Sequence, residues 1–136
     1  MPRKIFVNLP VQDLQKSIEF FKALGFTFNP QFTDETAACM VITEDIYTML
    51  LTHEKFSQFT PKAIADAHKT AEVLVCLSCE NREEVDATLQ KAEAAGGTLF
   101  RPANDYGFMY ERAFQDLDGH IWEVVWMDPA TVNPQN

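Results

Sequence analysis

The sequence lacks long apolar runs and has few cysteines, and each shortage argues against a class of protein. No stretch of about 18 apolar residues occurs, which predicts no transmembrane helix. Three cysteines are an odd number, and they argue against a disulfide framework. Asp13 and Lys16 interrupt the apolar positions that a secretory leader would need near the start. We therefore expect a cytoplasmic protein with no membrane partner.

Positive charge is also scarce. Lys and Arg total 11 against 20 Asp and Glu, which gives a formal net charge of −9. Such a chain repels phosphate backbones, so we expect no nucleic-acid partner. Cationic ligands would be attracted, although an acidic surface also serves solubility. Apolar residues make up 46 % of the 136 positions, which is enough for a packed core in one domain or two small modules.

The two halves of the chain repeat one pattern. Each half has a strand and then an amphipathic helix that ends at a glycine. These are residues 5–11, 13–24 and Gly25 in the first half, and residues 73–79, 82–95 and Gly96 in the second. Asp13 and Asn81 are the expected N-caps. Residue 73 follows residue 5 by 68 positions, which is half of 136, so the pattern indicates a tandem duplication.

Three extended runs follow each helix, so each module reads β-α-β-β-β and the fold class is α+β. The runs are residues 27–32, 37–43 and 46–52, and then 98–101, 108–115 and 120–127. Asp118-Gly119 is a typical hairpin signal. We expect a single domain, 1–136, with modules at 4–53 and 71–128, a linker at 54–70 and a flexible tail at 129–136. Thr60 and Pro61 predict a short linker helix over 60–67.

Two motifs carry a family resemblance. LPVxDLxxSxxFFxxLGF covers residues 9–26, and FxDxDGHxWEV covers residues 114–124. With the paired modules, they resemble the vicinal oxygen chelate superfamily, which includes glyoxalase I, bleomycin resistance proteins and extradiol dioxygenases. The resemblance covers about residues 4–128. It implies a cup-shaped mixed sheet with the helices outside, a homodimer, and a small-molecule ligand in the cup.

The resemblance also bears on metal binding. Metal-using members place His, Glu or Gln at four positions, which correspond here to Phe6, Met49, Leu74 and Glu123. Phe and Leu cannot bind a metal, and Met is too soft for the hard ions that imidazole and carboxylate hold. We therefore predict no metal and no other cofactor. The alternative is a divalent metal at a shifted set, Asn8, His53, Cys76 and Glu123.

Strand alternation predicts the lining of the cup. The expected ligand-binding residues are Phe6, Asn8, Tyr47, Met49, Leu51, Leu74, Cys76, Phe108, Tyr110, Arg112 and Glu123. The strand 108–114 offers two alternating sets, and we expect the set of Tyr110 and Arg112 to face inward rather than that of Met109 and Glu111. Cys76 and Cys79 match CxxC, but a strand points them to opposite faces, which indicates two buried thiols rather than a redox pair.

These residues predict a metal-free protein that binds an aromatic or amphipathic organic molecule, with cationic ligands included. Glu123 is then a counter-ion or a general acid/base, and Arg112 is its expected partner. The alternative is an enzyme of the lyase, isomerase or extradiol dioxygenase type, which would use a metal at reassigned ligands or Glu123 itself. A third reading is an interaction module that pairs through open sheet edges. The ligand, and whether one chain or two complete the cup, stay open.

Overall fold

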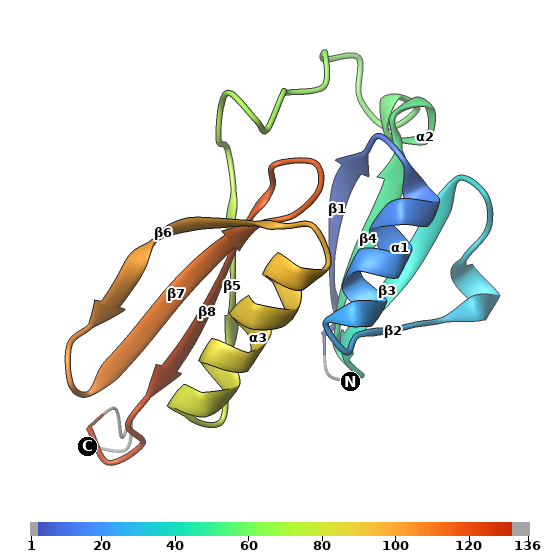
Figure 1. Cartoon of the computed structure of the whole chain (residues 1–136). Coiled ribbons are helices and arrows are strands. Elements are labelled where there is room, and N and C mark those ends of the chain that lie inside the picture. Colours follow the sequence, from blue (N-terminus) through green and yellow to red (C-terminus); the bar gives the residue numbers. More distant parts are fainter. Residues whose placement is uncertain (1–2, 132–136) are drawn as a thin grey trace. The chain divides into compact units, whose positions relative to one another are not determined.

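The computed structural model describes residues 3–131, and the chain divides into two compact units, Met1–Asp66 and Ala67–Asn136 (Figure 1). Each unit holds a four-stranded mixed sheet with a helix after its first strand. The α+β class and the β-α-β-β-β modules are thus confirmed. No helix within residues 3–131 is both long and apolar enough to cross a membrane.

The first unit builds its sheet in the order β1-β4-β3-β2. Its elements are β1 (Ile5–Val11), α1 (Leu14–Ala23), β2 (Thr27–Phe28), a 3-10 turn (Pro30–Phe32), β3 (Ala37–Thr43) and β4 (Ile46–Thr52). Asp13 caps α1 by accepting a hydrogen bond from the Lys16 backbone N–H, as predicted. Phe21 of α1 and Met40 and Leu50 of the sheet are fully buried, so the core lies between α1 and this face.

The second unit repeats the layout in the order β5-β8-β7-β6. Its elements are β5 (Leu74–Ser78), α3 (Arg82–Ala94), β6 (Thr98–Asp105), β7 (Met109–Gln115) and β8 (Ile121–Met127). Asn81 caps α3, and α3 lies across one face of the sheet (Figure 1). Trp122 and Phe114 stack on that side with ring centroids 6.5 Å apart, and both are buried.

The connection between the units differs from the prediction. The short helix α2 spans His53–Ser57, and residues 60–67 form no helix, so the predicted linker helix is wrong. The Thr52 hydroxyl accepts a bond from Lys55 N, three residues on, as an N-cap does. The Thr60 hydroxyl instead accepts from Lys62 N, two residues on, and closes only a local turn.

The predicted tail lies mostly outside the described residues, which end at 131. Up to residue 131, backbone hydrogen bonds hold the end of the chain in place. Asp128 N–H donates to the Phe108 carbonyl at 2.7 Å, and Thr131 N–H donates to the Asp128 carbonyl at 3.0 Å. Residues 128–131 therefore form a turn rather than a free end.

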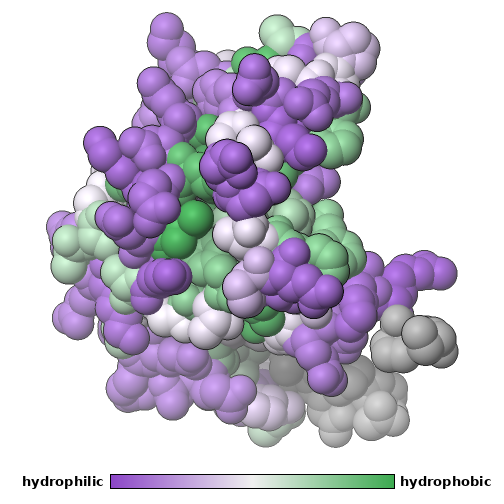
Figure 2. Space-filling model, turned by 90° about the vertical axis from the view of Figure 1, so that its right-hand side faces the viewer, coloured by the Kyte–Doolittle hydropathy of each residue, from purple (hydrophilic) through white to green (hydrophobic). Residues whose placement is uncertain are grey.

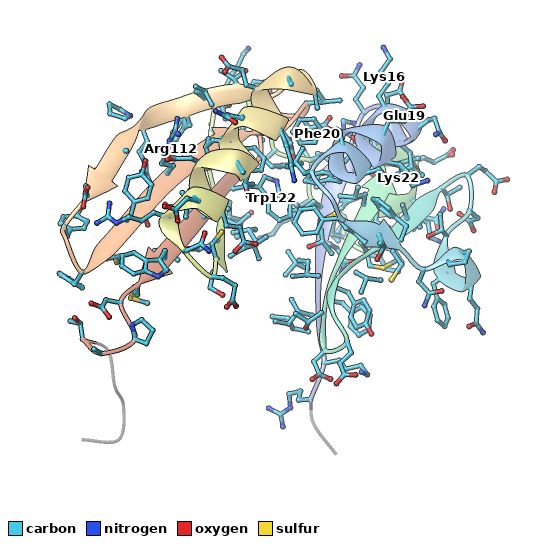
Figure 3. All side chains as sticks on the ribbon, turned by 60° about the horizontal axis from the view of Figure 1, so that its bottom comes forward. Lys16, Glu19, Phe20, Lys22, Arg112 and Trp122 are labelled. Atoms are coloured by element: carbon cyan, nitrogen blue, oxygen red, sulfur yellow. The ribbon has the colours of Figure 1, made fainter. Side chains whose placement is uncertain are left out.

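The face of the molecule drawn in Figure 2 is mainly hydrophilic. Figure 2 shows patches of hydrophobic residues (green) set among hydrophilic ones (purple) on one face. On α1, Lys16, Glu19 and Lys22 are exposed and point away from the sheet in Figure 3. Large apolar side chains that stay exposed include Phe6, at 52 % exposure, and Leu74, at 54 %.

A buried carboxylate fixes the turn between β7 and β8. Asp116 accepts hydrogen bonds from the backbone N–H groups of Asp118 and His120 and from Trp122 Nε1, at 2.9 to 3.0 Å. Burial raises the pKa of Asp116, while the Trp122 bond and His120 oppose that rise. Gly119 completes the turn with φ +86°, where a Cβ would lie 2.8 Å from the His68 backbone nitrogen. The turn thus aligns β8 with β7.

We expect Asp116→Ala to lower the free energy of unfolding by about 2–3 kcal/mol, because it leaves the buried Trp122 Nε1–H and two backbone donors unpaired. Urea denaturation followed by tryptophan fluorescence measures the change. Glu93→Ala, which removes an exposed carboxylate on α3, is the control and should change stability by less than about 0.5 kcal/mol. Equal effects of the two substitutions would contradict the role of the turn.

Candidate functional site

The candidate site lies on the face of the second sheet that α3 leaves uncovered. Strand register places Cys76 of β5 and Ala113 of β7 on either side of Glu123 of β8. Glu111 shares this face because it lies two residues before Ala113. Trp122 and Val124 alternate with Glu123 and are buried on the opposite face. We call the uncovered surface of β5–β8 the open face.

An ion-pair cluster occupies the middle of the open face. Arg101 Nη2 lies 2.8 Å from Glu123 Oε2 and 3.2 Å from Glu111 Oε1. Asn104 Nδ2 also donates to Glu111 Oε1 at 3.2 Å. The three charged side chains are 17 to 25 % exposed, so solvent screens them less than it screens a surface pair. Two carboxylates against one guanidinium leave one net negative charge in the cluster.

The irregularity of β6 accounts for the position of Arg101. β6 is an edge strand, and its pairing with β7 shifts register both before Arg101 and between Arg101 and Asn104. Pro102 follows Arg101 and has no N–H to donate to a ladder. Such bulges re-aim side chains, and here they flank an arginine whose guanidinium reaches two strands further into the sheet. The sequence predicts that this strand ends at residue 101, whereas β6 continues to Asp105.

The predicted inward set of β7 is wrong. The Tyr110 hydroxyl donates to Asp86 Oδ1 at 2.7 Å, and Arg112 Nη1 donates to the same oxygen at 2.9 Å. Asp86 belongs to α3, so Tyr110 and Arg112 lie on the helix side, where Figure 3 labels Arg112 and Trp122. The Tyr110 bond and then Arg112 lower the pKa of Asp86.

The partner of Glu123 is therefore Arg101 and not Arg112. Phe108, which was placed in the same inward set, precedes β7 and is 45 % exposed. Its ring centroid lies 6.4 Å from that of Tyr106, and its part in ligand binding stays a prediction. Arg101 and Asn104 were not predicted from the sequence, and Glu111 belongs to the alternative set of the strand 108–114; these three side chains meet on the open face.

Cys76 adds a thiol to the cluster. Its Sγ and one carboxylate oxygen each of Glu111 and Glu123 all lie within 4.8 Å of one another. Partial burial, and then Glu123 and Glu111, raise the pKa of Cys76, while Arg101 lowers it. Burial is also the main cause that raises the pKa of Cys79, to about 11. Cys76 is exposed and Cys79 is half-buried, so the expectation of two buried cysteines is wrong, but both thiols are weakly acidic.

The face of the first sheet opposite α1 carries mostly apolar side chains, of which Phe6 is 52 % exposed and Leu51 is buried. Phe6 and Tyr47 stack there with ring centroids 4.8 Å apart. Register places Asn8 beside Met49 and Pro10 beside Leu51, on the face opposite the buried Thr48 and Leu50. Phe6, Asn8, Tyr47, Met49 and Leu51 thus share one face. Whether they bind a ligand stays a prediction.

The four positions that the resemblance assigns to metal ligands do not fit a hard divalent ion. Phe6 is opposite Tyr47, and Leu74 is opposite Ile121, so neither side chain nor partner offers an oxygen or imidazole suited to such an ion. The carboxylate of Glu123 is paired with Arg101. In the shifted set, Cys76 is beside Glu123, whereas Asn8 is beside Met49 in the other unit.

Comparisons with known proteins agree with this architecture. The model of the bleomycin resistance protein-like N-terminal family matches residues 3–43. The structure of hypothetical protein SA1046 from S. aureus is 31 % identical over 93 % of this chain and 95 % of that chain, with a TM-score of 0.78. A glyoxalase-related enzyme from Fulvimarina pelagi is 20 % identical over 93 % and 88 %, with a TM-score of 0.76.

A glyoxalase/bleomycin resistance protein/dioxygenase family enzyme from Burkholderia phytofirmans PsJN gives a similar result. It is 18 % identical over 90 % of this chain and 96 % of that chain, with a TM-score of 0.74. The last two structures share the fold with this chain. No curated protein sequence matches it significantly.

We expect the alkylation rate of Cys76 to respond to the charges of the cluster. Glu123→Gln removes a charge that raises the Cys76 pKa, so the thiolate fraction and the rate at pH 8 should rise several-fold. Arg101→Gln removes a charge that lowers this pKa, so it should slow the reaction. Iodoacetamide labelling followed by peptide mass spectrometry gives the rates, and Arg112→Gln, on the helix side, is the control. Equal rates in all variants would contradict the electrostatic coupling.

Proposed function

Because this chain belongs to the vicinal oxygen chelate superfamily, we propose that it is a metal-free small-molecule-binding protein whose ligand is an aromatic or amphipathic organic cation. The observation that carries this proposal is the cluster of Arg101, Glu111 and Glu123 at the centre of the open face. Its residual negative charge attracts a cation, and its partial burial strengthens that attraction relative to a fully hydrated carboxylate.

Apolar side chains flank the cluster on the same face. Leu74 is 54 % exposed and Met127 is 42 % exposed, while Ile121 is buried and Met109 and Val125 are half-buried. Exposed apolar surface beside a charged cluster suits a ligand with a hydrocarbon or aromatic body and one cationic group. The formal net charge of −9 adds a long-range attraction for the same class of ligand.

Arg101 also supports binding rather than catalysis. An acid/base role for Glu123 needs a carboxylate oxygen within reach of a substrate proton. Arg101 Nη2 lies 2.8 Å from Glu123 Oε2 and holds that oxygen in an ion pair. The nearest second carboxylate, that of Glu111, is also paired with Arg101, at 3.2 Å. The predicted homodimer and cup remain predictions, which this proposal does not require.

A thermal-shift screen tests the proposal with matched pairs of ligands, each an aromatic ammonium compound and its neutral isostere. A bound cation at 100 times its Kd should stabilise the protein by about 2.7 kcal/mol, whereas its isostere should give a much smaller shift. In calorimetry, Glu123→Gln and Glu111→Gln should each weaken the cation by about tenfold, or about 1.4 kcal/mol.

Glu80→Gln is the control for that experiment, because it removes a carboxylate that is exposed just after β5. Its affinity for the cation should equal that of the native chain. Neutral isosteres that bind as tightly as the cations would overturn the assignment of ligand charge. Equal losses in Glu80→Gln and Glu123→Gln would show that the attraction comes from net charge and not from the open face.

A further inference from the structure

The open face holds three donor groups that would suit a thiophilic divalent ion. They are the Cys76 thiol and the carboxylates of Glu111 and Glu123, with donor atoms within 4.8 Å of one another. A tetrahedral Zn²⁺ ion binds thiolate sulfur at about 2.3 Å and carboxylate oxygen at about 2.0–2.2 Å, so two of its donors lie about 3.4–3.7 Å apart. The three groups would have to move closer together by about 1 Å to share one ion.

A cation of the chain itself already bridges two of these donors. Arg101 Nη2 contacts Glu123 Oε2 at 2.8 Å and Glu111 Oε1 at 3.2 Å. A divalent ion shared by the two carboxylates would have to displace this nitrogen, break both ion pairs and move a side chain that is only 25 % exposed. Asn104 further holds Glu111 by donating to the oxygen that Arg101 also contacts.

We propose that Arg101 is the resident cation of this cluster and keeps divalent metal ions out of it. Removing the charge of Arg101 then uncovers a three-donor site, Cys76, Glu111 and Glu123, for a thiophilic divalent ion. Arg101 is in this sense the residue that selects against metal at the open face. The inference concerns metal alone, so it does not depend on the proposed organic ligand.

The backbone supports such a role. The register shifts on both sides of Arg101 and the proline that follows it set this residue apart from a regular edge strand. Nη1 of Arg101 is buried with no hydrogen-bond partner among the described residues. Leaving a buried guanidinium nitrogen unpaired is costly. The guanidinium thus contacts both carboxylates through Nη2 while its Nη1 has no partner within residues 3–131.

The test is metal binding by the native chain and by Arg101→Gln, purified without a histidine tag. Co²⁺ reports on the thiol through sulfur-to-metal charge-transfer absorption in the near ultraviolet, and calorimetry with Zn²⁺ gives affinity and stoichiometry. We expect Arg101→Gln to bind one ion per chain at least about tenfold more tightly than the native chain, with the charge-transfer band present. Arg101→Lys keeps the charge and should behave like the native chain.

Two controls locate the ion. Cys76→Ser in the Arg101→Gln background should abolish the band and weaken Zn²⁺ binding. Arg112→Gln removes an arginine from the same sheet on the helix side, where its partner is Asp86, and should leave metal affinity unchanged. Circular dichroism and thermal melts establish that each variant is folded, and Arg101→Met replaces Arg101→Gln if the latter does not fold.

Three results would overturn the inference. One is native chain that binds Zn²⁺ as tightly as Arg101→Gln or Arg101→Met does. Another is folded Arg101→Gln or Arg101→Met that binds no metal. The third is an equal gain of affinity in Arg112→Gln, which would indicate a general effect of charge. Failure of the organic-cation screen would not change the interpretation of these results, because the metal experiment contains no organic ligand.

Discussion

The parallel pairing of β5 with β8 is the contact on which the candidate site depends. It joins the first and last strands of the second unit and brings Cys76 beside Glu123, which lie 47 positions apart in the sequence. β7 then pairs with the other side of β8 and supplies Glu111. Because β8 is flanked on both sides, a one-residue shift of its register would move Glu123 to the helix side and expose Trp122. The Asp116 turn opposes such a shift.

The second sheet separates its charges by face. Arg112 and Tyr110 meet Asp86 on the side of α3, and Arg101 meets Glu111 and Glu123 on the open face. In the group formed by Asp86, Tyr110 and Arg112, one carboxylate meets one guanidinium, so that group is balanced. The open face has an excess carboxylate. In the proposed function, this local excess of negative charge acts together with the net charge of the chain to attract a cationic ligand.

Much of the fold could be predicted from the sequence, because the signals were local. Asp13 and Asn81 cap their helices, and Gly25 and Gly96 have positive φ at the helix ends. The helix expected over 60–67 did not form, because a threonine and a proline are a starting signal that is also compatible with a turn.

The site was harder to predict than the fold. Alternation in β7 gives two possible faces, and the choice depends on Asp86, a partner from another element. The placement of the Arg101 side chain on the open face depends on two bulges, and Pro102 is the only clear sequence signal for them.

The same irregularity of β6 has a consequence for association between chains. A regular edge strand offers a row of free N–H and C=O groups to which another strand can add, which is a common route to aggregation. β6 has Pro102 and two register shifts in eight residues, so its outer edge is a poor template for strand addition. The bulges that deliver a guanidinium to the interior of the open face therefore also protect one border of the sheet from growth by further strands.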